Sequence, residues 1–144
     1  MNTQQITQNT LEDFKVSLKL KLATLWASFM FLYIYIDYLH FYMPNKIKDI
    51  QAVKVFVFDI TQGFLLAVLV SMTIPVLMIF LSVALPAKVN RWANIIIAAM
   101  YIPYMLFNLA GEAWMHMVFG AVIEVVLLCL IIRYAWKWTP RVEA

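Results

Sequence analysis

Long apolar stretches separated by short polar segments dominate the sequence. Four of them are long enough to form membrane-spanning helices, and they cover residues 22–43, 56–85, 91–110 and 114–136. A hydrocarbon core of about 30 Å is crossed by roughly 20 helical residues. The stretches lack the alternation of transmembrane β-strands, so the pattern predicts helices as the spanning structure.

The polar segments between the stretches are short. They comprise residues 44–54, 86–90 and 111–113. Links of this length connect antiparallel neighbours in helix bundles. We therefore expect an all-α membrane protein, with one antiparallel, up-down bundle of four transmembrane helices over residues 21–138.

The N-terminal residues predict a short amphipathic helix ahead of the first span. Residues 10–13 resemble a capping box with Asp in place of Glu, and apolar residues then recur at helical spacing beside Lys15 and Lys19. This helix either lies on the inner membrane surface or extends the first span into the cytoplasm. Residues 1–20 would then form one cytoplasmic tail and residues 139–144 a second.

Composition identifies the solvent of this chain. Hydrophobic residues make up 65% and charged residues 13% of it, against roughly 45–50% and 25% in soluble proteins. A domain this small cannot bury so much apolar surface in water. With 3 Gly, 5 Pro and 1 Cys, the chain also does not fit the collagen-like, disordered or disulfide-rich classes. The lipid bilayer is therefore its expected environment.

The basic residues predict an orientation. Most of them flank one side of the expected spans, and cytoplasmic segments of membrane proteins are enriched in Lys and Arg. We read the net charge of +3 as this topology signal and not as nucleic-acid binding. We expect a bacterial inner membrane protein with both termini in the cytoplasm. The basic residues on the cytoplasmic side are Lys15, Lys19, Lys21, Lys88, Arg91, Arg133, Lys137 and Arg141, and those on the other side are Lys46, Lys48 and Lys54.

Ionisable side chains inside the spans are the candidate functional residues. Each costs roughly 2.5–3.5 kcal/mol to insert and therefore needs a reason. Glu124 lies ten residues after Trp114, about 15 Å along the fourth span and close to the bilayer midplane. It shares a helical face with His116 through i, i+4, i+8 spacing.

Polar residues of the other spans converge on the same outer half of the membrane. Pro75 and Pro103 are expected to kink the second and third spans and to open an outward-facing polar cavity. The candidate ligand-binding residues are Tyr33, Asp37, His40, Asp59, Gln62, Tyr101, Tyr104, Asn108, Glu112, His116 and Glu124.

Three interpretations of these residues stay open. They are polar contacts that hold the helices together, or a pocket for a small amphiphilic ligand, a lipid or a proton-coupled solute, or a metal or quinone site. Transport would require a homo-oligomer, because four helices are few for a transporter. Asp37-x-x-His40 has the spacing of a ligand pair, but di-metal bundles use two Glu-x-x-His motifs.

No catalytic signature accompanies the polar residues. The sequence contains no glycine-rich phosphate loop, no Cys-x-x-Cys and no Gly-x-Ser-x-Gly motif, and it indicates no specific cofactor. We therefore expect a non-enzymatic membrane protein that binds a small ligand. The alternatives are a metal- or quinone-dependent membrane enzyme and a structural or partner subunit of a membrane complex.

Three segments carry a resemblance to a known family. They are KLATLWASFMFLYIYIDY in the first span, LPAKVNRWANIII at the start of the third and RYAWKW at the end of the fourth. With them the chain resembles a family of uncharacterised bacterial four-span membrane proteins, known only as a domain of unknown function. The resemblance implies a small inner-membrane protein with four spans and assigns no activity and no site residues.

Overall fold

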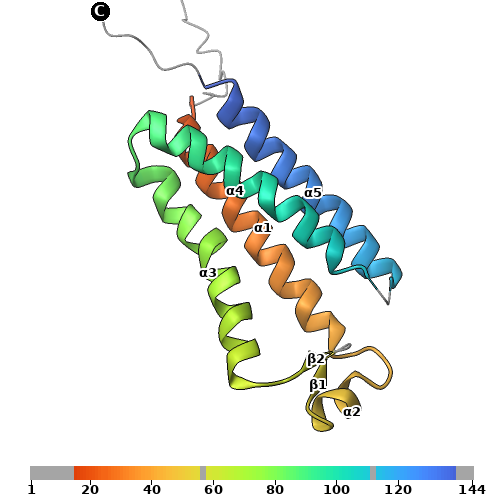
Figure 1. Cartoon of the computed structure of the whole chain (residues 1–144). Helices are drawn as coiled ribbons and strands as arrows, with labels where there is room; N and C mark the ends of the chain where they lie inside the picture. Colours follow the sequence, from red (N-terminus) through yellow and green to blue (C-terminus); the bar gives the residue numbers. More distant parts are fainter. Residues whose placement is uncertain (1–14, 56–57, 111–112, 139–144) are drawn as a thin grey trace, which may run out of the picture.

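The computed structural model describes residues 15–55, 58–110 and 113–138. They form five helices and a small hairpin, which confirms the helical prediction (Figure 1). The elements are α1 (Leu18–His40), α2 (Lys46–Gln51), β1 (Lys54–Val55), β2 (Phe58–Asp59), α3 (Gln62–Ala84), α4 (Ala87–Phe107) and α5 (Met115–Trp136).

Local sequence signals determine where the long helices begin and end. The hydroxyl of Ser17 accepts a hydrogen bond from the backbone N–H of Leu20 at the start of α1, at 3.3 Å. Thr61 caps α3 in the same way through the N–H of Phe64, at 3.1 Å. These caps satisfy N–H groups that have no partner within the helix. Leu85 is extended because Pro86 follows it, and this ends α3.

The four long helices pack side by side, with neighbours along the chain running in opposite directions (Figure 1). Helix α1 lies between α3 and α5, and α4 packs along α5. Helices α3 and α4 contact each other much less. They lie close together at their short link and diverge towards their other ends (Figure 1).

Aromatic and small residues shape the interior. Trp26 and Phe29 of α1 are fully buried and meet edge to face, with ring centroids 5.9 Å apart. Phe29 also meets Tyr101 of α4 edge to face at 6.2 Å. A β-carbon on Gly120 of α5 would overlap the side chain of Ile36 of α1. Gly120 therefore permits α1 and α5 to approach each other closely.

Large apolar side chains cover much of the outside of the long helices. Phe31, Leu69, Phe80 and Phe119 are among those with more than half of their surface exposed. Among the described residues, α1, α3 and α5 are long and apolar enough to cross a membrane, which supports the expected membrane association. Helix α4 is not one of these three.

Several element boundaries differ from the expected spans. Helix α3 begins at residue 62 rather than 56, because Lys54 pairs with Asp59 and Val55 with Phe58 in an antiparallel hairpin. Helix α4 covers residues 87–107 rather than 91–110.

Helix α1 begins at Leu18, so the last residues assigned to the amphipathic helix belong to the first candidate span. Residues 15–17 are not helical. The rest of the expected N-terminal helix, and the C-terminal tail at 139–144, lie outside the described residues.

Candidate functional site

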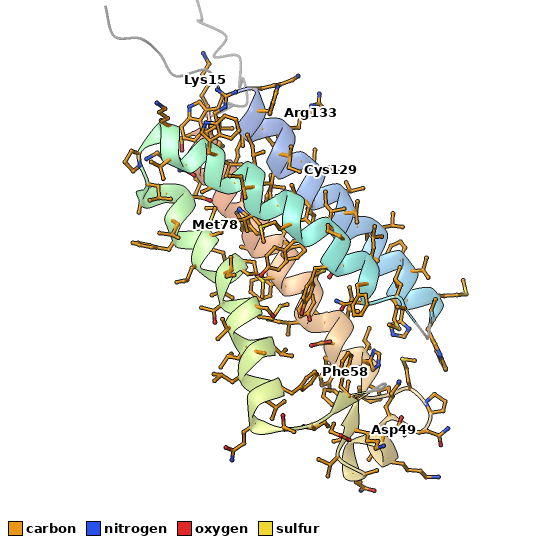
Figure 2. The ribbon with its side chains drawn as sticks, viewed as in Figure 1. Lys15, Asp49, Phe58, Met78, Cys129 and Arg133 are labelled. Carbon is orange, nitrogen blue, oxygen red and sulfur yellow. The ribbon has the colours of Figure 1, made fainter. Side chains whose placement is uncertain are left out.

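The two ends of the helix bundle differ in charge. We name as the basic end the end that holds Lys19, Lys88, Arg91 and Arg133, and as the hairpin end the opposite one, which holds α2, β1 and β2. Figure 2 shows Lys15 and Arg133 at the basic end and Asp49 and Phe58 at the hairpin end.

Two carboxyl groups lie within the long helices. The structure describes α1, α3, α4 and α5 completely, and Asp37 of α1 and Glu124 of α5 are the acidic residues in them. These two side chains are close enough to interact electrostatically. Two acidic residues that lie 87 positions apart in the sequence (124 − 37) therefore share one site.

Glu124 is the more deeply buried of the two. Only 4% of its surface is exposed, and its Oε1 atom has no hydrogen-bond partner among the described residues. Gly120 lies one turn before it, at the close approach to Ile36, and this approach brings the carboxyl against α1. Asp37, in contrast, is exposed. The site therefore has one buried and one accessible acidic group.

Two tyrosines complete this group of side chains. The Tyr33 hydroxyl interacts with Asp37, Glu124 and the Tyr104 side chain, so residues of α1, α4 and α5 meet here. We name Tyr33, Asp37, Tyr104 and Glu124 the carboxyl cluster.

Helix α3 reaches this cluster through the kink at Pro75. Proline has no N–H, so the carbonyl of Ser71, four residues earlier, loses its helical partner. The Tyr101 hydroxyl of α4 donates a hydrogen bond to that carbonyl. The Ser71 hydroxyl in turn lies 3.4 Å from the Tyr104 hydroxyl. A proline predicted only as a kink thus anchors α4 to α3.

The other predicted site residues are not all part of the cluster. His40 interacts with Asp37 and lies at its edge. Asp59, Gln62 and Asn108 are exposed, and the first two lie near the start of α3, which diverges from α4 (Figure 1). Glu112 lies outside the described residues.

His116 is half-buried at the start of α5. Its ring meets that of Trp114 edge to face, with centroids 6.3 Å apart. Its Nε2 atom is buried and has no hydrogen-bond partner among the described residues. In the part of the chain that the structure describes, no three His, Cys, Asp or Glu side chains come together as metal ligands would.

A second polar network, largely missed by the sequence analysis, lies nearer the basic end. The Trp26 indole donates to Asn94 Oδ1 at 2.7 Å, and the Ser82 hydroxyl donates to the same oxygen at 3.3 Å. Asn94 Nδ2 donates to Asn90 Oδ1 at 2.6 Å, and Asn90 Nδ2 donates to the Ser82 carbonyl at 2.5 Å. The i, i+4 spacing of the two asparagines was the available signal. We name these four residues the asparagine network.

Basic side chains bind helix C-termini at the same end. Lys19 Nζ donates to the carbonyls of Val83 at 3.0 Å and Leu85 at 2.7 Å, where α3 ends. Arg91 donates to the Trp136 carbonyl at 3.2 Å, at the end of α5. Cations are favourable there because the last carbonyls of a helix lack partners and carry partial negative charge.

The structure also contains an apolar hollow of about 410 Å³ at the start of α5. No residue of the carboxyl cluster lines it, so this hollow is not the polar cavity expected from the sequence. Its lining residues are Ala113, Met115, Val118, Phe119 and Val122.

Comparison with known proteins identifies the family and no function. No curated protein and no solved structure is significantly similar to this chain. A family model described as a family of unknown function (DUF6326) matches residues 11–143. This range includes all four long helices, the carboxyl cluster and the asparagine network. The chain therefore belongs to the DUF6326 family, whose function is not known.

Proposed function

We propose that this protein is an integral membrane protein that binds a small amphiphilic ligand at the carboxyl cluster. The observation that carries the proposal is Glu124, a carboxyl group with 4% of its surface exposed and an Oε1 atom without a hydrogen-bond donor among the described residues. Buried polar atoms in native proteins are almost always paired, so an unpaired one needs an explanation. A bound ligand would provide the missing donor.

The proposal includes all four long helices as membrane spans in one antiparallel bundle. Helix α4 has 21 residues, a length of about 32 Å that suffices for the hydrocarbon core. Asn90 and Asn94 make its sequence more polar, but both are fully buried and hydrogen-bonded in the asparagine network. Their polarity therefore does not face lipid, and α4 can span despite it.

The charges of the bundle support the proposed orientation. Lys19, Lys88, Arg91 and Arg133 all lie at the basic end. The positive-inside tendency places this end at the cytoplasmic surface. In this orientation both termini are cytoplasmic and the carboxyl cluster opens outward in a bacterial inner membrane.

The asparagine network supports a ligand rather than a purely structural role for Glu124. In that network the Trp26 indole and the amides of Asn90 and Asn94 all have partners. The fold therefore satisfies these buried polar groups with its own side-chain and backbone atoms. The Oε1 atom of Glu124, in contrast, has no hydrogen-bond partner among the described residues. Intramembrane ionisable residues without a structural explanation commonly mark ligand or ion sites.

The exposed Asp37 and the two tyrosines suit the polar head of such a ligand, and the surrounding apolar side chains suit its apolar part. A proton-coupled solute fits the same groups. If the protein transports this ligand, it would do so as a homo-oligomer.

Native mass spectrometry of the protein purified in a mild detergent tests the proposal. We expect a small molecule to be retained by the wild-type protein and by D49N, which removes the exposed carboxyl of Asp49 on α2. We expect E124Q to lose it, with affinity reduced roughly 10- to 100-fold, because a hydrogen bond to a charged group contributes about 1.5–3 kcal/mol. Identical retention by E124Q and D49N would contradict the proposal.

A further inference from the structure

We infer that the ligand of the carboxyl cluster is an amphiphilic organic cation, with a positively charged head that lies between Asp37 and Glu124. This inference rests on the proposed function and specifies its ligand class. Three observations support it: the distribution of charge within the long helices, the missing hydrogen-bond partner of Glu124, and the aromatic side chains around the cluster.

The distribution of Lys and Arg in the long helices leaves Glu124 without a nearby basic side chain from these helices. The Lys and Arg residues of the four long helices all lie within five residues of the helix termini at the basic end; they are Lys19, Lys21, Lys88, Arg91 and Arg133. Arg133, the nearest along α5, is nine residues from Glu124, which is about 14 Å of helix rise.

The groups that face the two acids are therefore acidic, phenolic or imidazole. Glu124 interacts with Asp37 and Tyr33, and Asp37 interacts additionally with His40. His40 lies on the Asp37 side, at the last residue of α1. No Lys or Arg is among these neighbours. His40, which can carry a positive charge, acts on Asp37, so Glu124 is the member of the pair without the cationic partner that buried acids normally have.

A cation between the two carboxyl groups would both reduce the repulsion between them and supply the hydrogen-bond donor missing at Glu124. It separates two like charges that otherwise repel each other, and opposite charges attract strongly where water is excluded. A protonated amine head also supplies the hydrogen-bond donor that Glu124 Oε1 lacks. An anionic or neutral head would satisfy at most one of these requirements.

The surrounding side chains favour an organic cation over a bare metal ion. Among the described residues no three metal-ligating side chains come together. Aromatic rings lie at the site instead. The ring centroids of Tyr101 and Tyr104 are 5.7 Å apart, and the Tyr33 side chain interacts with Tyr104. Aromatic faces attract ammonium-type cations, and more strongly where water is excluded. Apolar groups on the same ligand would pack against these rings.

Two probes of nearly equal size and opposite charge test the inference on the purified wild-type protein. Equilibrium dialysis in an uncharged detergent at neutral pH measures the binding of phenylbutylammonium and of phenylpentanoate. We expect saturable binding of the ammonium cation and at least tenfold weaker binding of the carboxylate anion. Because this comparison uses the wild-type protein, it does not depend on whether any variant folds.

Variants then locate the binding. E124Q and D37N are each expected to weaken ammonium binding at least tenfold, whereas D49N, which removes an exposed carboxyl on α2, leaves it unchanged. Size-exclusion chromatography of each variant reports whether it is folded.

Several outcomes would overturn the inference: equal binding of both probes, no saturable ammonium binding, or full binding by folded E124Q and D37N. If native mass spectrometry still finds a small molecule retained through Glu124, the proposed function stands and only the cationic class is wrong. If that molecule is absent as well, both proposals fall.

Discussion

Asn94 and Glu124 show how differently two buried polar residues are treated in one helix bundle. Asn94 is fully buried. Its amide accepts hydrogen bonds from Trp26 and Ser82 and donates to both the carbonyl and the side-chain oxygen of Asn90. Glu124 is almost as buried, yet its Oε1 atom has no donor among the described residues. At the residue scale, the complete hydrogen bonding of Asn94 is typical of a structural contact, whereas the unpaired oxygen of Glu124 is typical of a binding site.

Replacing Asn94 tests the structural role of the asparagine network. N94A removes the acceptor of the Trp26 indole and the partner of Asn90. We expect it to lower the free energy of unfolding by about 1–3 kcal/mol, because buried groups are then left unsatisfied. Denaturation in detergent measures the loss. N108A, which changes an exposed asparagine at the end of the same helix, is the control, and equal stability of the two variants would argue against the network.

At the scale of elements, the kink in α3 and the tyrosines of α4 form one unit. Helices α3 and α4 contact each other little, so each polar contact between them matters more. Pro75 leaves the Ser71 carbonyl without its helical partner, and Tyr101 supplies a new one from the neighbouring helix. The proline thereby creates the acceptor that ties the two helices together.

This pairing predicts a non-additive pair of substitutions. Y101F removes the donor and is expected to destabilise the protein by about 1 kcal/mol, the usual size of an interhelical hydrogen bond. In a P75A background, the new alanine has an N–H that can donate to the Ser71 carbonyl, so the same substitution is expected to cost close to zero. A double-mutant cycle on unfolding free energies measures the coupling. Additive effects would show that the carbonyl freed by Pro75 is not what Tyr101 stabilises.

At the scale of the whole molecule, the number of spans decides which side each polar group faces. If α4 crosses the membrane, Val89 near its start and Ala110 just beyond its end lie on opposite sides, with Ala110 on the side of α2. If α4 lies along one surface, both residues face the same side. Charge placement and the buried asparagines favour the first arrangement.

Cysteine labelling from outside intact cells distinguishes these arrangements. In a C129S background, which removes the exposed natural thiol, we expect K48C and A110C to react with an impermeant maleimide. V89C and K137C are expected to react only after the membrane is permeabilised. C129S alone is the control for background labelling. Reaction of V89C and A110C under the same condition would overturn the four-span topology, and inverted labelling of all four would reverse the orientation.

Much of the helical organisation could be predicted, because apolar runs and their breaks are local properties of the chain. The fourth predicted span, 114–136, agrees with α5 to within one residue at its start. The start of the second was placed too early, because this segment is apolar enough to continue a helix whereas Val55 pairs with Phe58 in a hairpin. Hydropathy registers the apolar character of a segment and not its backbone pairing.

The candidate site was predicted in part. Tyr33, Asp37, Tyr104 and Glu124 were all among the candidates, since charged and phenolic groups inside apolar helices are conspicuous. Gln62, in contrast, lies exposed at the start of α3. Depth along a span can be counted from sequence, but the lateral position of a helix cannot.

By itself, the sequence determined that this chain forms apolar helices suited to lipid, that its basic residues gather at one end, and that few charges lie within the helices. These are consequences of residue type and spacing along one chain. Only the tertiary structure decided that Asp37 and Glu124 meet while Gln62 stays apart, and that Tyr101 takes the carbonyl freed by Pro75. The physical reason is that helix partners are selected by close packing, such as Gly120 against Ile36, and this packing joins residues distant in sequence.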